Sequence, residues 1–154
     1  MIFPYKKRVL QLDKSVIVAG VAGSGKSYLI DKLRKRSKVP LVHREVTEKN
    51  GIPTESIIHW PIAEKDQGIL KMSFENAALV IMMDKPWEEY SQNIHKRKHR
   101  VQYTRSGLSQ MRDKWCEIFS YHGLPIVFVN KNGERVVDVI QKMASALADH
   151  IKLL

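Results

Sequence analysis

The sequence predicts an α/β protein with a three-layer α/β/α fold, in which helices cover both faces of a parallel sheet. Short apolar runs of strand length, such as residues 16–19 and 124–129, alternate with segments of helical period. Strands that alternate with helices in this way form parallel sheets with helical connections. With 154 residues, 44% of them hydrophobic, the chain is expected to form one domain over residues 1–154.

An apolar strand leads directly into a glycine-rich loop and then into a helix. Residues 20–27 read G-x-x-x-x-G-K-S, the pattern of a phosphate-binding loop. In such a loop backbone N–H groups surround the phosphates, the lysine reaches the β- and γ-phosphates, and the serine hydroxyl ligates Mg²⁺. The following helix adds its dipole to the anion site. The residues expected to bind the nucleotide are Gly20, Val21, Ala22, Gly23, Ser24, Gly25, Lys26 and Ser27.

Charge and cysteine content narrow the classes of partner. Lys and Arg total 26 against 16 Asp and Glu, which gives a net charge of +10. This favours a polyanionic partner or substrate, although kinases of phosphorylated compounds are often basic as well. No segment approaches the roughly 18 apolar residues of a membrane span, so we expect a soluble cytoplasmic protein without a membrane partner, in the host cytoplasm if viral. The single cysteine, Cys116, excludes an intramolecular disulfide and is interpreted as a core residue.

The segments around the loop are basic. Residues 5–14 are expected to form a short strand or arm with a solvated surface. The first helix ends in five basic residues between 32 and 38, where cations complement the helix dipole, and Pro40 stops it. A second strand then begins at Leu41, and its end carries His43, Arg44 and Glu45.

Residues 46–75 are interpreted as an insertion that binds the phosphate acceptor. Turn signals recur through this segment, and ligands of parallel α/β proteins bind beyond the carboxyl ends of the strands. Two residues within it also have structural interpretations, because Trp60 can cap a core and His59 can be an ordinary surface or core histidine. The candidate acceptor residues are Arg44, Glu45, His59 and Trp60.

The apolar run at residues 77–83 ends in Asp84, as a Walker B strand ends in its acidic residue. Such a carboxylate positions the Mg²⁺ that bridges the β- and γ-phosphates. Asp84 can also cap the helix expected to start at Pro86. Glu45 and Asp84 are both candidates for the general base.

A helix from Pro86 leads into a basic segment, residues 95–107, which is interpreted as a lid. Arginines that close over transferring phosphates stabilise their charge, and the alternative is a solvated basic helix face. A core-facing helix up to Gly123, a strand at residues 124–129 and a final helix over residues 133–154 complete the predicted elements.

The loop, the D-x-P after the third strand, the basic stretch and residues 127–133 together resemble small P-loop kinases, thymidylate-kinase-like and adenylate-kinase-like. This resemblance implies ATP and Mg²⁺ as cofactors. It places Asp84 and Pro86 in the D-x-P motif and Arg97 and Arg100 in the lid, and makes Lys26, Asp84, Arg97 and Arg100 the expected catalytic residues. No nucleoside-monophosphate motif is legible between residues 46 and 74, so the acceptor departs from these families. The chain is also similar to phage kinases that phosphorylate 5-hydroxymethyluracil within DNA.

The expected function is therefore transfer of the γ-phosphate of ATP to a hydroxyl of a nucleotide or nucleic-acid base, with 5-hydroxymethyl-deoxyuridine in DNA as the specific hypothesis. One alternative is a nucleoside or nucleoside-monophosphate kinase. A GTP-binding switch is a second, but residues 130–133 lack the final acid of the guanine-reading N-K-x-D. A nucleic-acid-binding P-loop ATPase is a third. The sequence leaves the acceptor and the oligomeric state open.

Overall fold

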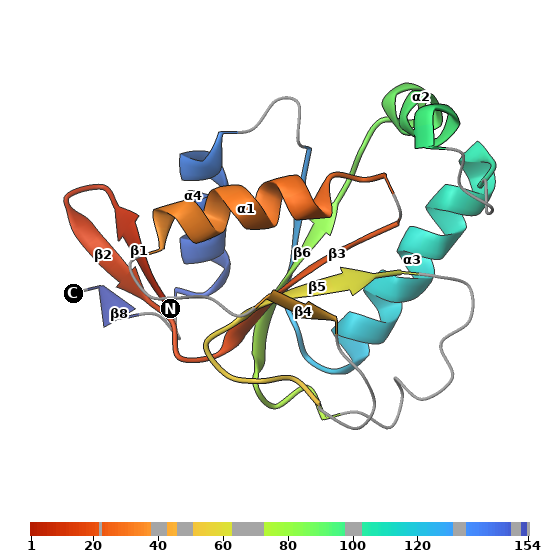
Figure 1. Cartoon of the computed structure of the whole chain (residues 1–154). Helices are drawn as coiled ribbons and strands as arrows, with labels where there is room; N and C mark the ends of the chain where they lie inside the picture. Colours follow the sequence, from red (N-terminus) through yellow and green to blue (C-terminus); the bar gives the residue numbers. More distant parts are fainter. Residues whose placement is uncertain are drawn as a thin grey trace.

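The computed structural model describes residues 1–21, 23–37, 43–45, 51–62, 73–97, 103–130, 135–148 and 152–153; for residues 43–45, 93–97 and 152–153 only the backbone is considered (Figure 1). The strands are β1 (Ile2–Tyr5), β2 (Arg8–Gln11), β3 (Ser15–Gly20), β4 (His43–Glu45), β5 (Ile57–Pro61), β6 (Ala77–Met83), β7 (Ile126–Val129) and β8 (Lys152–Leu153). The helices are α1 (Lys26–Arg36), α2 (Trp87–Arg97), α3 (Arg105–Tyr121) and α4 (Val136–Ala146).

The main sheet has five strands in the order β4-β5-β3-β6-β7. Every neighbouring pair in it is parallel, so all of its carboxyl ends lie at one edge. The central strand β3 pairs on one side with β5 and on the other with β6, with Ala19 opposite Trp60 and Met82. This arrangement confirms the predicted α/β class with a parallel sheet.

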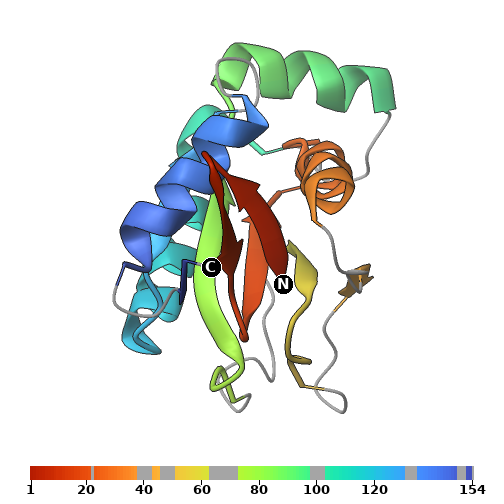
Figure 2. The same ribbon diagram turned by 90° about the vertical axis from the view of Figure 1, so that its left-hand side faces the viewer.

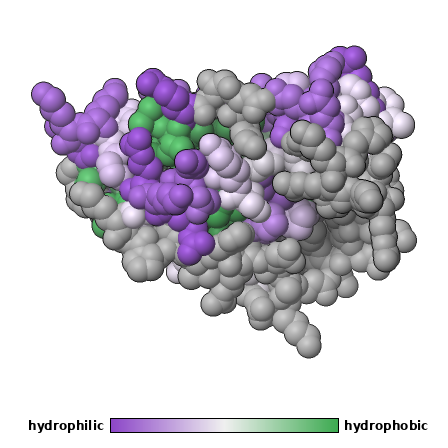
Figure 3. Space-filling model, turned by 45° about the horizontal axis from the view of Figure 1, so that its top comes forward, coloured by the Kyte–Doolittle hydropathy of each residue, from purple (hydrophilic) through white to green (hydrophobic). Residues whose placement is uncertain are grey.

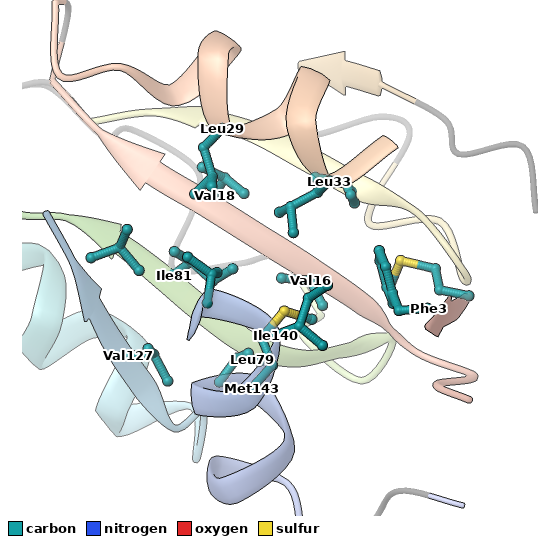
Figure 4. Packing of buried hydrophobic residues seen from close by; sticks show 14 of the residues in the cluster. Phe3, Val16, Val18, Leu29, Leu33, Leu79, Ile81, Val127, Ile140 and Met143 are labelled. Atoms are coloured by element: carbon teal, nitrogen blue, oxygen red, sulfur yellow. The ribbon is translucent and has the colours of Figure 1, made fainter. Parts of the chain in front are cut away.

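Both faces of the sheet are buried, because successive side chains of the central strands enter different cores. Val16 and Val18 of β3 belong to the first core, under α1 and α4, while Ile17 and Ala19 belong to the second, under α3. Figure 2 shows the helices on the two sides of the sheet, and Figure 4 shows the close packing of the first core. The fold therefore has the three predicted layers.

The apolar periodicity of α1 correctly identified its buried face. Leu29, Ile30 and Leu33 are all buried against the first core, as their spacing predicted. The helix ends at Arg36 with three basic residues in its last turn, where they complement the negative end of the dipole. The local sequence therefore predicts both the buried face and the basic C-terminal end of the helix that follows the loop.

The interpretation of residues 46–75 as an insertion outside the core is wrong. Within this segment β5 occupies the sheet position beside β3, and its residues Ile57 and Ile58 are fully buried. The prediction failed because the apolar run is short and is followed by His, Trp and Pro, which resemble a turn. Tertiary pairing with β3 overrides that local signal.

The two ends of the chain meet in a second, antiparallel sheet of order β1-β2-β8. The predicted N-terminal arm is a hairpin whose Phe3 and Leu10 are completely buried in the first core. The predicted final helix is too long, since α4 ends at Ala146 and β8 follows at Lys152–Leu153. A helical period alone could not reveal this strand, because it is two residues long.

The predicted basic segment, residues 95–107, lies at the junction of two helices. α2 extends to Arg97 and α3 begins at Arg105, while residues 98–102 lie outside the described part of the chain. Thr104 caps α3, because its side-chain oxygen accepts a hydrogen bond from the backbone N–H of Gly107 at 3.0 Å. The apolar spacing predicted a helix that starts at Leu108, its first core-facing residue. The helix in fact starts three residues earlier, at Arg105.

Cys116 is half-buried on α3 and packs against the second core, in agreement with the prediction. Burial raises the pKa of its thiol, which disfavours the thiolate needed for nucleophilic chemistry. None of the helices in the described ranges is long and apolar enough to cross a bilayer.

Candidate functional site

The loop between β3 and α1 has the shape that its glycines predict. Gly25, at the N-cap of α1, has φ 95°, and Gly23 has φ 81°, a left-handed backbone that residues with a Cβ adopt at a cost. No side chain caps α1, and its first turn contains no acidic residue. The positive end of the helix dipole therefore faces the loop without an acidic side chain to compensate it, as an anion site requires.

The ammonium group of Lys26 lies inside the loop. Only 6% of the residue is exposed, and its Nζ donates a hydrogen bond of 2.7 Å to the carbonyl oxygen of Val21. This contact joins the first helical residue to the start of the loop. A buried cation needs an anion or several acceptors around it, and a bound phosphate would be one such partner.

Ser24 is the second buried polar residue of the loop. It is 2% exposed, and its Oγ has no hydrogen-bond partner among the described residues. The same atom lies against Gly20, where a Cβ would collide with it and would come within 3.1 Å of the Met83 Cβ. An unsatisfied buried hydroxyl is rare in folded proteins and is consistent with a polar ligand at this position.

We expect Gly20→Ala to destabilise the protein by about 1–3 kcal/mol, because the new methyl group needs space that Ser24 occupies. Urea unfolding measures this change. Ser24→Ala is the matched second substitution, since it removes the colliding oxygen. Gly20→Ala combined with Ser24→Ala should recover part of the lost stability, and equal stability of Gly20→Ala and wild type would show that the loop is not so tightly packed.

Asp84 lies beside the loop at the same edge of the sheet, one residue past the end of β6. It is half-buried, and its Oδ1 accepts a hydrogen bond of 2.7 Å from Nη1 of Arg112 on α3. Burial acts to lower the pKa of Arg112, but the neighbouring carboxylates of Asp84 and Asp113 together outweigh it, so the pKa is raised. The guanidinium is therefore charged at neutral pH.

A cavity of about 260 Å³ lies beside the loop. Among the described residues, three basic side chains line it, Lys85, Arg105 and Arg112, together with one carboxylate, that of Asp84. The Nζ of Lys85 also reaches the loop, at 3.5 Å from the carbonyl oxygen of Gly23. The other lining residues are Val21, Ser24, Ile62, Met82, Met83, Pro86, Trp87, Tyr90, Leu108, Ser109 and Asn130.

The cavity combines an aromatic wall with excess positive charge. Trp87 and Tyr90 contribute the aromatic surface, with ring centroids 5.7 Å apart. Burial raises the pKa of the Tyr90 phenol, so it is protonated at neutral pH and can donate a hydrogen bond but cannot act as a base. Such a cavity fits a flat or partly apolar molecule that carries an anionic group.

The loop fits the phosphates of ATP, since it offers a buried ammonium, the N-terminus of α1 and the Ser24 hydroxyl, which has no hydrogen-bond partner in the described part of the chain. Among the described residues no cluster of three or more His, Cys, Asp or Glu side chains could hold a metal by itself. Mg²⁺ does not need one, because it is commonly held by one or two protein groups, substrate phosphates and water. Ser27, exposed in the first turn of α1, and Asp84 are the residues that would hold it.

Neither of the predicted acceptor residues with a described side chain, His59 and Trp60, is among the described residues that line the cavity. Trp60 is 3% exposed in the second core, with its ring centroid 5.6 Å from that of Phe119, which agrees with the alternative that it packs in a core. His59 is half-buried on β5. Arg44 and Glu45 lie on β4 at the far edge of the sheet, separated from β6 by two strands. The aromatic side chains around Trp60 support its interpretation as a core residue.

The predicted lid residues stay predictions. Arg97 ends α2, with its side chain outside the described part of the structure, and Arg100 and Ala22 lie outside the described residues. The described lining of the cavity contains Lys85, Arg105 and Arg112. Arg105 belongs to the basic segment 95–107 that was predicted to be a lid, whereas Lys85 and Arg112 were not among the predicted site residues. A sequence signal existed for the two arginines, because Arg105 and Arg112 are seven residues apart and lie on one face of a helix.

The chain resembles a known protein in its fold, whereas comparison of its sequence with protein families and curated proteins gives no match. No protein-family model matches the chain, and no curated protein matches it significantly. The crystal structure of an unliganded sugar kinase from Janibacter sp. HTCC2649 is similar in fold, with a TM-score of 0.51 and 15% sequence identity. The match covers 88% of this chain and 95% of that one. The chain therefore has the α/β fold of a known kinase structure over most of its length.

Proposed function

We propose that the protein is an ATP-dependent phosphotransferase. The observation that carries this proposal is the buried ammonium of Lys26 in a glycine-shaped loop, beside a cavity lined by Asp84, Lys85, Arg105 and Arg112. A donor phosphate at the loop and an acceptor in the cavity would be neighbours. The fold shared with a sugar kinase structure is consistent with this activity.

In this proposal the residues act mainly by positioning and by charge. Lys26 and the α1 N-terminus bind the donor phosphates, and Arg105 and Lys85 neutralise charge where donor and acceptor meet. Bound Mg²⁺, held by Ser27 and Asp84, would supply further neutralisation of the phosphate oxygens. Arg112 holds the Asp84 carboxylate in place through their 2.7 Å hydrogen bond. Asp84 is also the candidate general base, whereas Glu45 starts from the far edge of the sheet.

For the acceptor we propose a hydroxyl of a nucleotide or of a nucleic-acid base, with 5-hydroxymethyl-deoxyuridine in DNA as the specific hypothesis. The excess of positive charge in the cavity and the net charge of +10 support an anionic acceptor. The aromatic wall formed by Trp87 and Tyr90 suits a base. A nucleoside or nucleoside-monophosphate kinase is the alternative with the same chemistry.

We expect Asp84→Asn to lower the turnover rate with only a small loss of ATP affinity, because the neutral amide removes the charge that positions the metal. Steady-state kinetics with ATP and Mg²⁺ measure both parameters. A fall in melting temperature without a change in rate would instead assign Asp84 to helix capping or to the ion pair alone.

The experiment that tests the proposed function offers γ-labelled ATP with nucleosides, nucleotides, sugars, unmodified DNA and hydroxymethylated DNA in parallel. Label transfer to hydroxymethylated DNA supports the specific hypothesis, and transfer to a mononucleotide only supports the alternative kinase. Transfer to sugars alone would overturn the proposed acceptor class. Release of inorganic phosphate without transfer to any acceptor would indicate an ATPase or a switch and would contradict the phosphotransferase proposal.

A further inference from the structure

We propose that a surface at the opposite end of α1 from the loop binds the phosphate backbone of a nucleic acid. It is formed by exposed basic residues of the β1–β2 hairpin and of the last turn of α1, and we call it the hairpin–helix patch. Its members are Lys6, Lys7, Arg8, Arg34, Lys35 and Arg36.

The two groups of residues are distant in sequence but adjacent in the fold. Lys6 and Arg36 line the same surface hollow of about 330 Å³, together with Tyr5 and residues of α4. Figure 1 shows the end of α1 beside the hairpin, and Figure 3 shows hydrophilic surface over both elements. The fold thus joins two basic segments, separate in the sequence, into one surface.

Structural roles account for only part of this charge. Cations in the last turn of α1 complement its dipole, but this explains none of the hairpin residues. Within the described residues, Lys35 is the only member with an ion pair in the chain, at 3.1 Å from Asp31. Gathering like charges on one surface destabilises the folded state, and a polyanion that binds there would offset the repulsion.

The side chains between these charges favour a nucleic acid over a membrane. Tyr5, which lines the hollow, has the Lys6 ammonium 5.3 Å from its ring centroid. Aromatic rings among arginines and lysines suit stacked bases beside phosphates. Surfaces that insert into membranes expose several large apolar residues beside their cations, whereas among the described residues that line the hollow only Val137 is an exposed large apolar side chain.

The patch is distinct from the proposed ATP site. α1 has 11 residues, and it begins at the phosphate loop and ends at the patch. At a rise of 1.5 Å per residue, the two sites are about 15 Å apart. A nucleic acid on the patch would therefore leave the loop accessible, and it would bind without ATP.

Fluorescence anisotropy with a labelled DNA duplex of about 20 base pairs, without ATP, tests this proposal between about 50 and 200 mM salt. Wild type should bind with an affinity that falls as salt rises. Lys6→Asn with Arg36→Gln should bind more weakly and reduce the slope of log affinity against log salt by about 0.9 for each phosphate that the variant no longer neutralises. Asn is chosen because Lys6 has φ 54°, a conformation that Asn tolerates.

The matched control, Lys114→Gln with Lys142→Gln, removes the same charge from exposed positions on α3 and α4 and should leave the slope unchanged. Lys7→Gln with Arg34→Gln is a second patch variant, and it should behave like the first. Melting temperatures verify folding of each variant.

Equal reductions of affinity in patch and control variants, or binding to anionic phospholipid vesicles but not to DNA, would overturn the proposal. Lys26→Ala should retain DNA binding, so failure of the patch and failure of the ATP site are distinguishable.

Discussion

Lys26→Ala is expected to lower phosphate transfer by about 10²- to 10³-fold, because it removes the cation nearest to the donor phosphates. The ammonium is held in the loop by its 2.7 Å hydrogen bond to Val21, so its position is set before a ligand binds. Loss of a preorganised charge affects the transition state more than the folded state. Single-turnover transfer of γ-labelled phosphate measures the effect.

Lys35→Ala is the matched control on the same helix. Lys35 is exposed at the other end of α1 and pairs with Asp31. Its replacement should therefore leave the rate of phosphate transfer to a small-molecule acceptor unchanged. Comparable reductions in both variants would mean that the helix as a whole, rather than the loop lysine, is responsible. Lys26 is buried, so the variant's melting temperature must be measured beside the rate.

Arg112→Ala is expected to lower kcat by about 10²-fold and to reduce stability, because it leaves the half-buried Asp84 carboxylate without its partner. Asp84 would then lose its orientation toward the cavity as well as its charge compensation. Kinetics and urea unfolding of the same samples separate the two effects.

A double-mutant cycle with Asp84→Asn tests whether the pair acts as a unit. If Arg112 works through Asp84, the double variant should be little worse than either single variant. Lys114→Ala, an exposed neighbour on α3, should change neither parameter. Additive effects of Arg112→Ala and Asp84→Asn would show that the arginine acts independently, on the substrate itself.

The parts of the fold with strong local signals were predictable from the sequence. The glycine pattern identified the loop between β3 and α1, and the apolar spacing of Leu29, Ile30 and Leu33 identified the buried face of α1. β5 was missed because its identity as a strand depends on pairing with β3, far away in the chain. β8 was missed because it is held by pairing with the N-terminal hairpin.

The residues of the candidate site that directly follow predicted strands could be predicted from the sequence. The residues that reach the site through packing between distant elements could not. Ser24 lies in the loop that follows β3, and Asp84 follows the end of β6, so the neighbouring parallel strands bring both to the cavity. Arg105 and Arg112 reach the cavity because α3 packs on the second core through Trp115 and Phe119. The helical spacing in the sequence does not reveal which strands lie next to the arginine-bearing face of α3. The ion pair between Arg112 and Asp84 depends on this packing in the same way.

Calorimetric titration of the protein with ATP and Mg²⁺ tests the central claim most directly, because it requires no knowledge of the acceptor. If the loop from Gly20 to Ser27 binds the nucleotide phosphates, wild type binds ATP and Lys26→Ala binds it at least about tenfold more weakly, while Lys35→Ala binds as wild type does. Absence of ATP binding by wild type, or equal affinity of wild type and Lys26→Ala, would contradict the account.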